Sequence, residues 1–328
     1  MREGIDADKT VRMSGSVRPG KPRRGPEPSG HLLLWSGLAG VIVIVAAAYF
    51  IFLTPRVVPI KVANAREILA ARPAKLLVFR FRPDPDVIVL DFPTLHQQGE
   101  MLNRVAALVE KASAPRDRVL TESQLAAVIK ASGATPDTYY YGHDYRAADL
   151  VRFFHLMQQD HVAANPEERW LRALLGQLHW FRAGAVGAII TLPGPGAAPG
   201  LDASGRATIF EHESSHGAYF TIPAYDAYAH RFFYHVLTTP ERELFRRFLA
   251  GEGYDTAITD LVINETQAYL MFTPDPRFFS AALVGMYPQV LQALRETFWR
   301  NIPVPWLKRS VPDPVVTKPQ PRPATVGG

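Results

Sequence analysis

The feature that most constrains this chain is an uninterrupted run of 22 residues without a charged side chain, residues 32–53, LLLWSGLAGVIVIVAAAYFIFL. As an α-helix rising ~1.5 Å per residue, the run would be about 33 Å long, enough to cross a hydrocarbon layer of roughly 30 Å. A buried helix of a soluble core is rarely apolar on every side. The run therefore predicts a transmembrane helix.

A cleaved signal peptide is the main alternative to a permanent anchor. Its apolar region is shorter, about 7–15 residues, and small residues follow at the cleavage site. Here Thr54-Pro55-Arg56 follows the run directly. We therefore expect an uncleaved signal-anchor. Five basic residues lie in the 20 positions before the run and four in the 20 after it, which favours a cytoplasmic N-terminus and a periplasmic or extracytoplasmic main body.

Composition excludes several classes of protein. The 328 residues contain no cysteine, so disulfide scaffolds and cysteine-ligated zinc fingers are excluded, and a metal site would have to use His and carboxylate ligands. The net charge of +5 belongs largely to residues 1–31, which carry seven Lys/Arg and four Asp/Glu, whereas the remainder carries 29 and 27. A nearly balanced body gives no reason to expect a nucleic-acid partner.

The pattern along the chain predicts five segments. Residues 1–31 are a disordered basic leader, residues 32–53 the transmembrane signal-anchor, and residues 307–328 a Pro-rich disordered tail. Between them we expect a small α/β subdomain at 56–143 and a mainly helical domain at 144–306. The fold class predicted for the body is α+β, mainly helical.

Apolar periodicity and helix-capping residues place the individual elements. The β-rich runs lie at residues 76–81, 87–92 and 185–192. Helices are expected at residues 95–112, from Thr121, around the stripe Leu150/Phe153/Phe154/Met157, from Asn165-Pro166, and at residues 225–237, 240–250, 255–272 and 288–300.

One short motif has the residue types and spacing of a metal site: HESSH, from His212 to His216. On a helix, positions i and i+4 lie about 40° apart around the axis, so both imidazoles can face one metal ion. Glu213 lies one step round, suited to a metal-bound water. This H-E-x-x-H spacing is typical of zinc hydrolases, in which the Glu is the general base. Its alternative is a chance pair of core histidines. Ile209 and Tyr219 share the histidines' face, however, and two imidazoles on a core-facing stripe need a polar partner or a metal.

A zinc site needs a third protein ligand, for which we considered three positions. The metzincin pattern would place a third histidine at position 222, which is Ile222. Asp226 is a possible carboxylate ligand. The third candidate is Glu265, the one carboxylate in the otherwise apolar helical stripe of Ile258–Phe272, where burial without a cation costs several kcal/mol. A salt bridge to an Arg, or a neutral hydrogen-bonded carboxyl, would also satisfy Glu265.

HESSH followed downstream by Asn264-Glu265-Thr266-Gln267-Ala268-Tyr269 resembles the gluzincins, whose H-E-x-x-H helix is completed by a Glu from an N-E-x-x-A-type motif. The resemblance covers residues 208–272, about a fifth of the chain. It implies a zincin-like metallopeptidase fold for residues 144–306, with His212, His216 and Glu265 as Zn²⁺ ligands and Glu213 as catalytic base. The gap between His216 and Glu265 is longer than in the best-known gluzincins. The acid that several of them place four residues after the ligand Glu is Tyr269 here, which leaves the partners of the histidines unassigned.

The sequence thus predicts a single-pass, membrane-anchored zinc-dependent hydrolase, a peptidase acting on peptide or protein substrates. By analogy with zincins, residues 185–192 would be an edge strand that pairs with an extended substrate. An additional donor should stabilise the oxyanion, and the sequence does not select one among the nearby residues, most of which we expect to be packing residues: Tyr219, Tyr225, Tyr228, His230, Tyr234 and His235. Two alternatives remain: a catalytically inactive zincin-like binding or assembly protein of the cell envelope, and a structural envelope domain with a coincidental HExxH.

Overall fold

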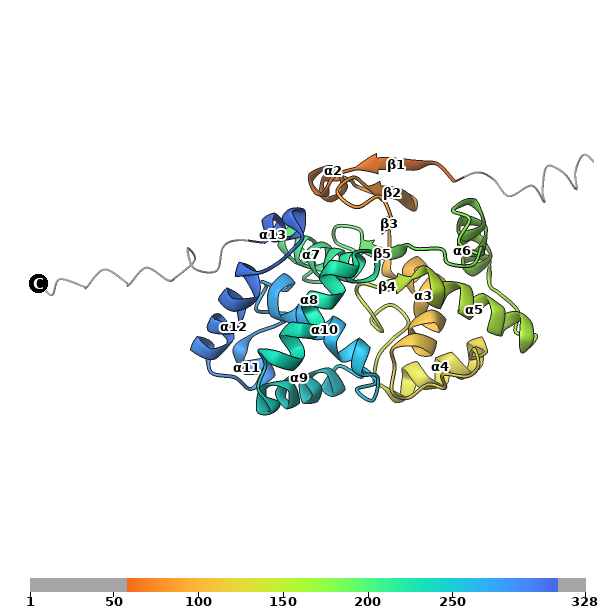
Figure 1. Cartoon of the computed structure of the whole chain (residues 1–328). Coiled ribbons are helices and arrows are strands. Elements are labelled where there is room, and N and C mark those ends of the chain that lie inside the picture. Colours follow the sequence, from red (N-terminus) through yellow and green to blue (C-terminus); the bar gives the residue numbers. More distant parts are fainter. Residues whose placement is uncertain (1–57, 312–328) are drawn as a thin grey trace, which may run out of the picture. The chain divides into compact units, whose positions relative to one another are not determined.

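The computed structural model describes residues 58–311 (Figure 1). The predicted leader at 1–31 and signal-anchor at 32–53 lie outside these residues, as do residues 312–328 of the predicted tail. The predicted start of the tail at residue 307 is wrong, because residues 307–310 belong to a helix in which Leu307 is fully buried. None of the helices within 58–311 is long and apolar enough to cross a bilayer. The described part is α+β and mainly helical, as the sequence predicts.

Five strands form one mixed sheet in the order β1-β2-β3-β5-β4. β1 and β2 pair in parallel, β2 and β3 are antiparallel, β3 and β5 are parallel, and β5 and β4 are antiparallel. The strands are β1 Ile60–Ala63, β2 Leu77–Phe81, β3 Val87–Phe92, β4 Asp144–Arg146 and β5 Ala188–Pro193. The predicted subdomains on either side of residue 143 share this sheet, since β1, β2 and β3 come from the first and β4 and β5 from the second.

The prediction of an edge strand at residues 185–192 is wrong. β5 lies inside the sheet, hydrogen-bonded to β3 on one side and β4 on the other. β4, only three residues long, is the edge strand at this end. All six residues of β5 are buried, as expected of a strand covered on both faces.

Helices cover both faces of the sheet. On one face, the even positions of β3 pack with α3 and α5, whereas its odd positions face α7, so every residue of β3 is buried. The helices that precede α7 are α2 Ala65–Ala70, α3 Leu95–Val109, α4 Glu122–Ala131, α5 Ala147–Gln159 and α6 Pro166–Gln177.

The C-terminal half is a helical layer built around α7, with its own aromatic-rich core. Figure 1 shows these helices on the side of α7 away from α3, α5 and α6. They are α7 Ala203–Thr221, α8 Pro223–His235, α9 Thr239–Gly251, α10 Thr259–Phe272, α11 Ala281–Val284, α12 Pro288–Arg300 and α13 Pro305–Ser310.

The predicted helix-capping residues are present. Thr121 and Asn165 cap α4 and α6, each with a reciprocal side-chain bond from the residue three positions on. The predicted helices at 225–237, 240–250, 255–272 and 288–300 correspond to α8, α9, α10 and α12, with shifts of a few residues at their ends.

α7 is attached to the sheet by a buried ion pair. The Arg206 guanidinium donates two parallel hydrogen bonds to the Asp91 carboxylate on β3, both 3.0 Å, and further bonds to Pro193 O and Ile68 O. Both side chains of the pair are almost fully buried. One side chain thus joins α7 to β3, the end of β5, and α2.

Replacing Arg206 with Met should lower the free energy of unfolding by about 3–5 kcal/mol, because it leaves the Asp91 carboxylate buried without its partner. Denaturant unfolding measures the change. The double variant Asp91→Leu/Arg206→Met should recover part of the loss, and Arg231→Met, an exposed control on α8, should change it by less than ~0.5 kcal/mol. An Arg206→Met protein as stable as the parent would contradict this role.

Candidate metal centre

The HESSH motif lies in α7, the long helix that crosses the sheet. Gly217 follows the second histidine, and a Cβ at this position would come within 2.9 Å of Val87 Cγ2 on β3. The missing side chain therefore lets α7 lie directly on the strand. His212 and His216 are one turn apart on this helix, and their rings meet edge to face with centroids 4.7 Å apart. Both rings face α10.

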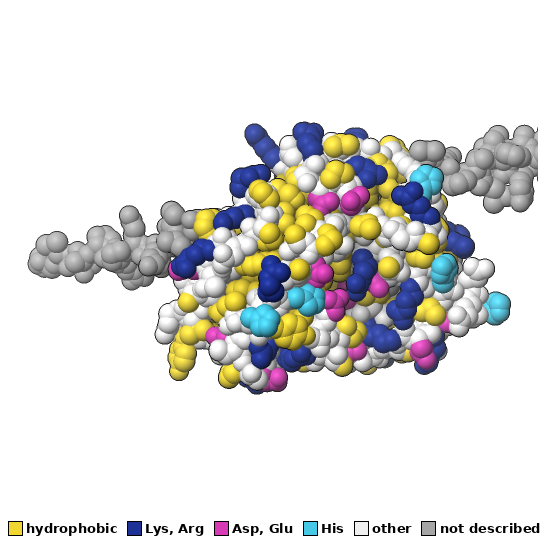
Figure 2. Space-filling model, viewed as in Figure 1, with side chains coloured by type: hydrophobic (Ala, Val, Ile, Leu, Met, Phe, Trp, Pro, Cys, Tyr) yellow, Lys and Arg dark blue, Asp and Glu magenta, His cyan; other side chains and the backbone are white. Residues whose placement is uncertain are grey.

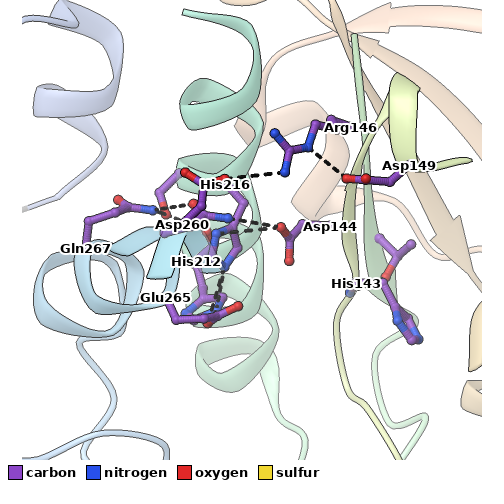
Figure 3. A network of polar contacts seen from close by, with 12 residues as sticks. His143, Asp144, Arg146, Asp149, His212, His216, Asp260, Glu265 and Gln267 are labelled. Atoms are coloured by element: carbon purple, nitrogen blue, oxygen red, sulfur yellow. Dashed lines mark hydrogen bonds and ion pairs between the residues drawn. The ribbon is translucent and has the colours of Figure 1, made fainter. Parts of the chain in front are cut away.

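α10 brings Glu265 to the two histidines (Figure 3). The two Nε2 atoms are 3.0 Å apart, and Glu265 Oε2 lies 3.7 Å from each of them. Three donors on a tetrahedral zinc ion, at bond lengths near 2.1 Å, would be about 3.4 Å apart. The three observed separations lie on either side of this value, so the donors are already spaced to hold a metal ion.

The ionisation states of the histidines suit a metal. Burial lowers the pKa of His216 to about 4 and the pKa of His212 well below its usual value. Both rings are therefore neutral at pH 7, the form in which imidazole binds metals.

The pKa values of the neighbouring carboxyl groups are shifted in the opposite direction, upward. Burial, and then the charge of Glu110, raises the pKa of Glu265; burial, and then the charge of Glu265, raises the pKa of Glu213. Each has an Oε2 that is buried without a hydrogen-bond partner. A cation placed among them would favour their charged forms and so lower both pKa values.

Thr273, just after α10, fixes the orientation of His212. Its hydroxyl donates to Ala268 O at 3.1 Å and therefore accepts from His212 Nδ1 at 2.8 Å. This places the ring proton of His212 on Nδ1 and leaves a lone pair on Nε2, the atom directed at His216 and Glu265. Thr273 is one of the histidine partners that the motif alone does not identify.

Asp144 on the edge strand β4 lies behind His216, in the position that corresponds to that of Thr273 behind His212. Its Oδ2 lies 3.7 Å from His216 Nδ1, a buried nitrogen with no hydrogen-bond partner. Asp144 Oδ2 accepts from Asn264 at 3.5 Å, and Gln267 donates to Asn264 Oδ1 at 3.4 Å. Tyr225 in turn donates to Gln267 Oε1 at 2.5 Å. A chain of polar side chains thus runs from the core of the helical layer to the back of His216.

Asp144→Asn should weaken metal binding by roughly 10–100-fold, the loss typical when the outer partner of a ligating histidine is changed. The measurement is a competition titration of the purified full chain against a chelator of known affinity. Asp137→Asn, which changes a half-exposed carboxylate paired with His96, is the matched control and should bind as the parent does. If the two variants bound the metal ion with equal affinity, Asp144 would have no role in metal binding.

Glu213, the predicted base, lies close to His216, one of the three donors, and to Asp144, and is only 5% exposed. The backbone at Gly142 passes so close that a Cβ there would overlap Glu213 Oε1. Because residue 142 is glycine, the Glu213 carboxylate fits beneath the segment that leads into β4. The site as a whole is enclosed, with His216 fully buried and the His212 side chain 13% exposed.

Two other groups of side chains in the described part could hold a metal ion. One is Asp144, Glu213 and His216, which shares His216 with the first group. The other is Asp226, His230 and Asp260 on the surface. There His230 faces Asp226 with Nδ1, at 2.8 Å, and Asp260 with Nε2, at 3.6 Å. Since opposite ring nitrogens face the two carboxylates, no single nitrogen of His230 faces both, and this group fits one ion less well than the first group does.

Most of the residues considered as oxyanion donors have other surroundings. Tyr225 and Tyr228 belong to the aromatic core, Tyr234 is half exposed, and Tyr219 donates to Asp260 at 2.7 Å. Asp226, the alternative third ligand, lies with His230. One aromatic residue that does contact the metal donors is Tyr269, whose ring centroid lies 4.8 Å from that of His212. Its place four residues after Glu265, on the same helical face, is the signal that could have identified it.

No family model, curated protein or solved structure matches this chain. The assignment of a function therefore depends on the residues and their geometry.

Proposed function

We propose that this protein is a zinc-dependent hydrolase, a gluzincin-type peptidase, anchored in a membrane by residues 32–53 with its body outside the cytoplasm. One observation carries the proposal: the convergence of His212, His216 and Glu265, with donor atoms 3.0–3.7 Å apart, beside a buried carboxylate at Glu213. Two neutral imidazoles and one carboxylate are a ligand set that zinc hydrolases use. This set leaves a fourth position open.

A zinc ion bound there would lower the pKa of water towards ~7 and polarise a carbonyl group. Glu213 has the position and the chemistry of a general base. It would accept the proton of the attacking water and return it to the amine that leaves when the peptide bond breaks. Thr273 holds the His212 ring from behind by a hydrogen bond, and Asp144, 3.7 Å from His216 Nδ1, would do the same for His216 once it came within hydrogen-bond distance.

The sheet supports a peptide as the substrate. β4 has a neighbouring strand on one side only, and extended peptides add to sheets at such edges. Asp144 on β4 is close to His216, so a peptide along this edge would lie beside the metal donors. We therefore propose that residues 144–146, and not residues 185–192, form the edge strand that pairs with an extended substrate.

The burial of the site favours one second candidate, a zincin-like binding or assembly protein in which zinc has a structural role. Glu213 lies beneath the backbone at Gly142, and the His212 side chain is the most exposed of the three donors at 13%. A structural metal needs no path for a substrate.

The test begins with metal stoichiometry. The full chain, purified in detergent without chelators, should contain one zinc per molecule by elemental analysis. It should cleave members of a mixed peptide library, with the activity lost to a chelator and restored by zinc. Zinc without cleavage would favour the binding protein. A folded chain that takes up no zinc would refute the metal centre, and HESSH would then be a chance pair of core histidines.

A further inference from the structure

The strongest feature outside the metal centre is a basic layer, which we define as residues 58–82, comprising β1, α2 and β2. Its side chains include six Lys/Arg and a single acid, Glu67. The rest of the chain after residue 31 carries 23 Lys/Arg and 26 Asp/Glu, so the net positive charge of the body lies in this layer. Figure 2 shows dark-blue side chains along the end of the molecule that β1 and α2 form in Figure 1, and others across the rest of this face.

The charges of this layer are free to bind an external partner. Lys61, Arg66 and Lys75 are exposed, and no ion pair or side-chain hydrogen bond among the described residues involves them. Arg72 is also exposed and donates only to backbone carbonyls at the end of α2. Structural ion pairs therefore leave most of these cations unneutralised.

The layer also offers an apolar contact and an unpaired strand. β1 is the other edge of the sheet, and Val62 in its middle is 57% exposed. Basic side chains around an exposed aliphatic group are typical of surfaces that meet lipid headgroups. The layer is fixed to the body through Arg206, which donates to Ile68 O in α2, so its orientation follows from the fold.

The position of the layer in the sequence identifies the partner. Only four residues, 54–57, separate the apolar run from the first described residue, Val58. Even fully extended, at up to about 3.6 Å per residue, the five steps from Leu53 to Val58 could carry the chain no more than about 18 Å from a hydrocarbon boundary. The headgroup region itself occupies several of those ångströms. A layer of free cations held so close to a bilayer meets phosphate groups before any other anion.

We propose that the basic layer docks on anionic phospholipid headgroups and fixes the orientation of the body on the membrane. The inference depends on the membrane anchor proposed above and not on the metal centre. Each Lys or Arg near an anionic surface strengthens its attachment roughly fivefold. Three or four of them would therefore hold the body against the bilayer, whereas the anchor alone would leave it free to turn.

The test uses the full chain in nanodiscs made of zwitterionic phospholipid, with or without phosphatidylglycerol, followed by hydrogen exchange at residues 58–82. Anionic lipid should slow exchange in β1 and α2 several-fold at low salt, and ~1 M salt, where the Debye length is about 3 Å, should remove the difference. The variant Lys61→Gln/Arg66→Gln/Lys75→Gln should lose the effect. Its matched control, Lys130→Gln/Arg231→Gln/Arg247→Gln, changes three exposed cations on α4, α8 and α9 and should keep it.

The outcomes separate the two proposals. An inserted chain that exchanges equally in both lipids would overturn the docking surface and leave the anchor intact. A chain that does not enter the nanodisc would overturn both. Equal slowing by a soluble acidic polysaccharide on zwitterionic discs would also overturn the inference, because it would make the layer a general polyanion site.

Discussion

Glu213→Gln should reduce the rate of peptide hydrolysis by ~10²–10⁴-fold, the usual contribution of a general base, while the zinc content stays at that of the parent. The amide keeps the shape of the carboxylate but cannot accept a proton from water. The side chain lies beside the metal donors and has a free Oε2, so the change removes chemistry without opening a cavity. Steady-state cleavage of a peptide from the library screen, together with elemental analysis, measures both quantities.

Glu211→Gln is the matched control. Glu211 lies on the same helix, burial raises its pKa to about 7, and it belongs to none of the three candidate metal groups. This variant should cleave as the parent does. If Glu213→Gln cleaved normally, the general-base role would be refuted. If it lost its metal instead, the ion would belong to the group of Asp144, Glu213 and His216.

Glu265→Gln should weaken zinc binding by at least ~100-fold, since removing a direct ligand costs more than the 10–100-fold loss seen when an outer partner changes. The amide retains the volume of the carboxyl but loses the charge that attracts the cation. Competition with a chelator measures the affinity, and the thermal midpoint measured with and without zinc gives an independent value, because an ion that binds only the folded state stabilises it.

The Glu265 variant also separates the two overlapping metal groups. Asp144 and Glu265 lie on opposite sides of the His216 ring, 3.7 Å from its Nδ1 and Nε2 respectively. If Glu265→Gln kept its zinc while Asp144→Asn lost it, the ion would bind on the Nδ1 side, and the gluzincin-type arrangement would be refuted.

The parts of this fold that the sequence predicts well are those set by local chemistry. β3 occupies the predicted residues 87–92, and α6 begins where Asn165 and Pro166 place it. Helix periodicity and capping act over a few residues, so a single sequence contains the information. The same is true of the motif, because an i, i+4 pair on one helix needs no tertiary contact to share a face.

Strand order, in contrast, depends on segments far apart in the chain. The analogy with zincins places residues 185–192 at an edge, and nothing in those residues reveals that β4 pairs beside β5. β4 itself has three residues, too few for a periodic signal. For the same reason the sequence leaves Asp144 and Thr273 unassigned, since they meet the histidines only after β4, α7 and α10 have packed together.

The close seating of α7 on β3 at Gly217 has a further consequence, for the thermodynamics of metal uptake. A helix in direct contact with the sheet cannot turn about its axis or slide along it without strain in the core. Two of the three donors are therefore preorganised before an ion arrives, and Thr273 fixes one ring in its binding tautomer. The protein therefore loses little conformational entropy when an ion binds. This smaller entropy cost makes the affinity for the ion higher than it would be at a flexible site.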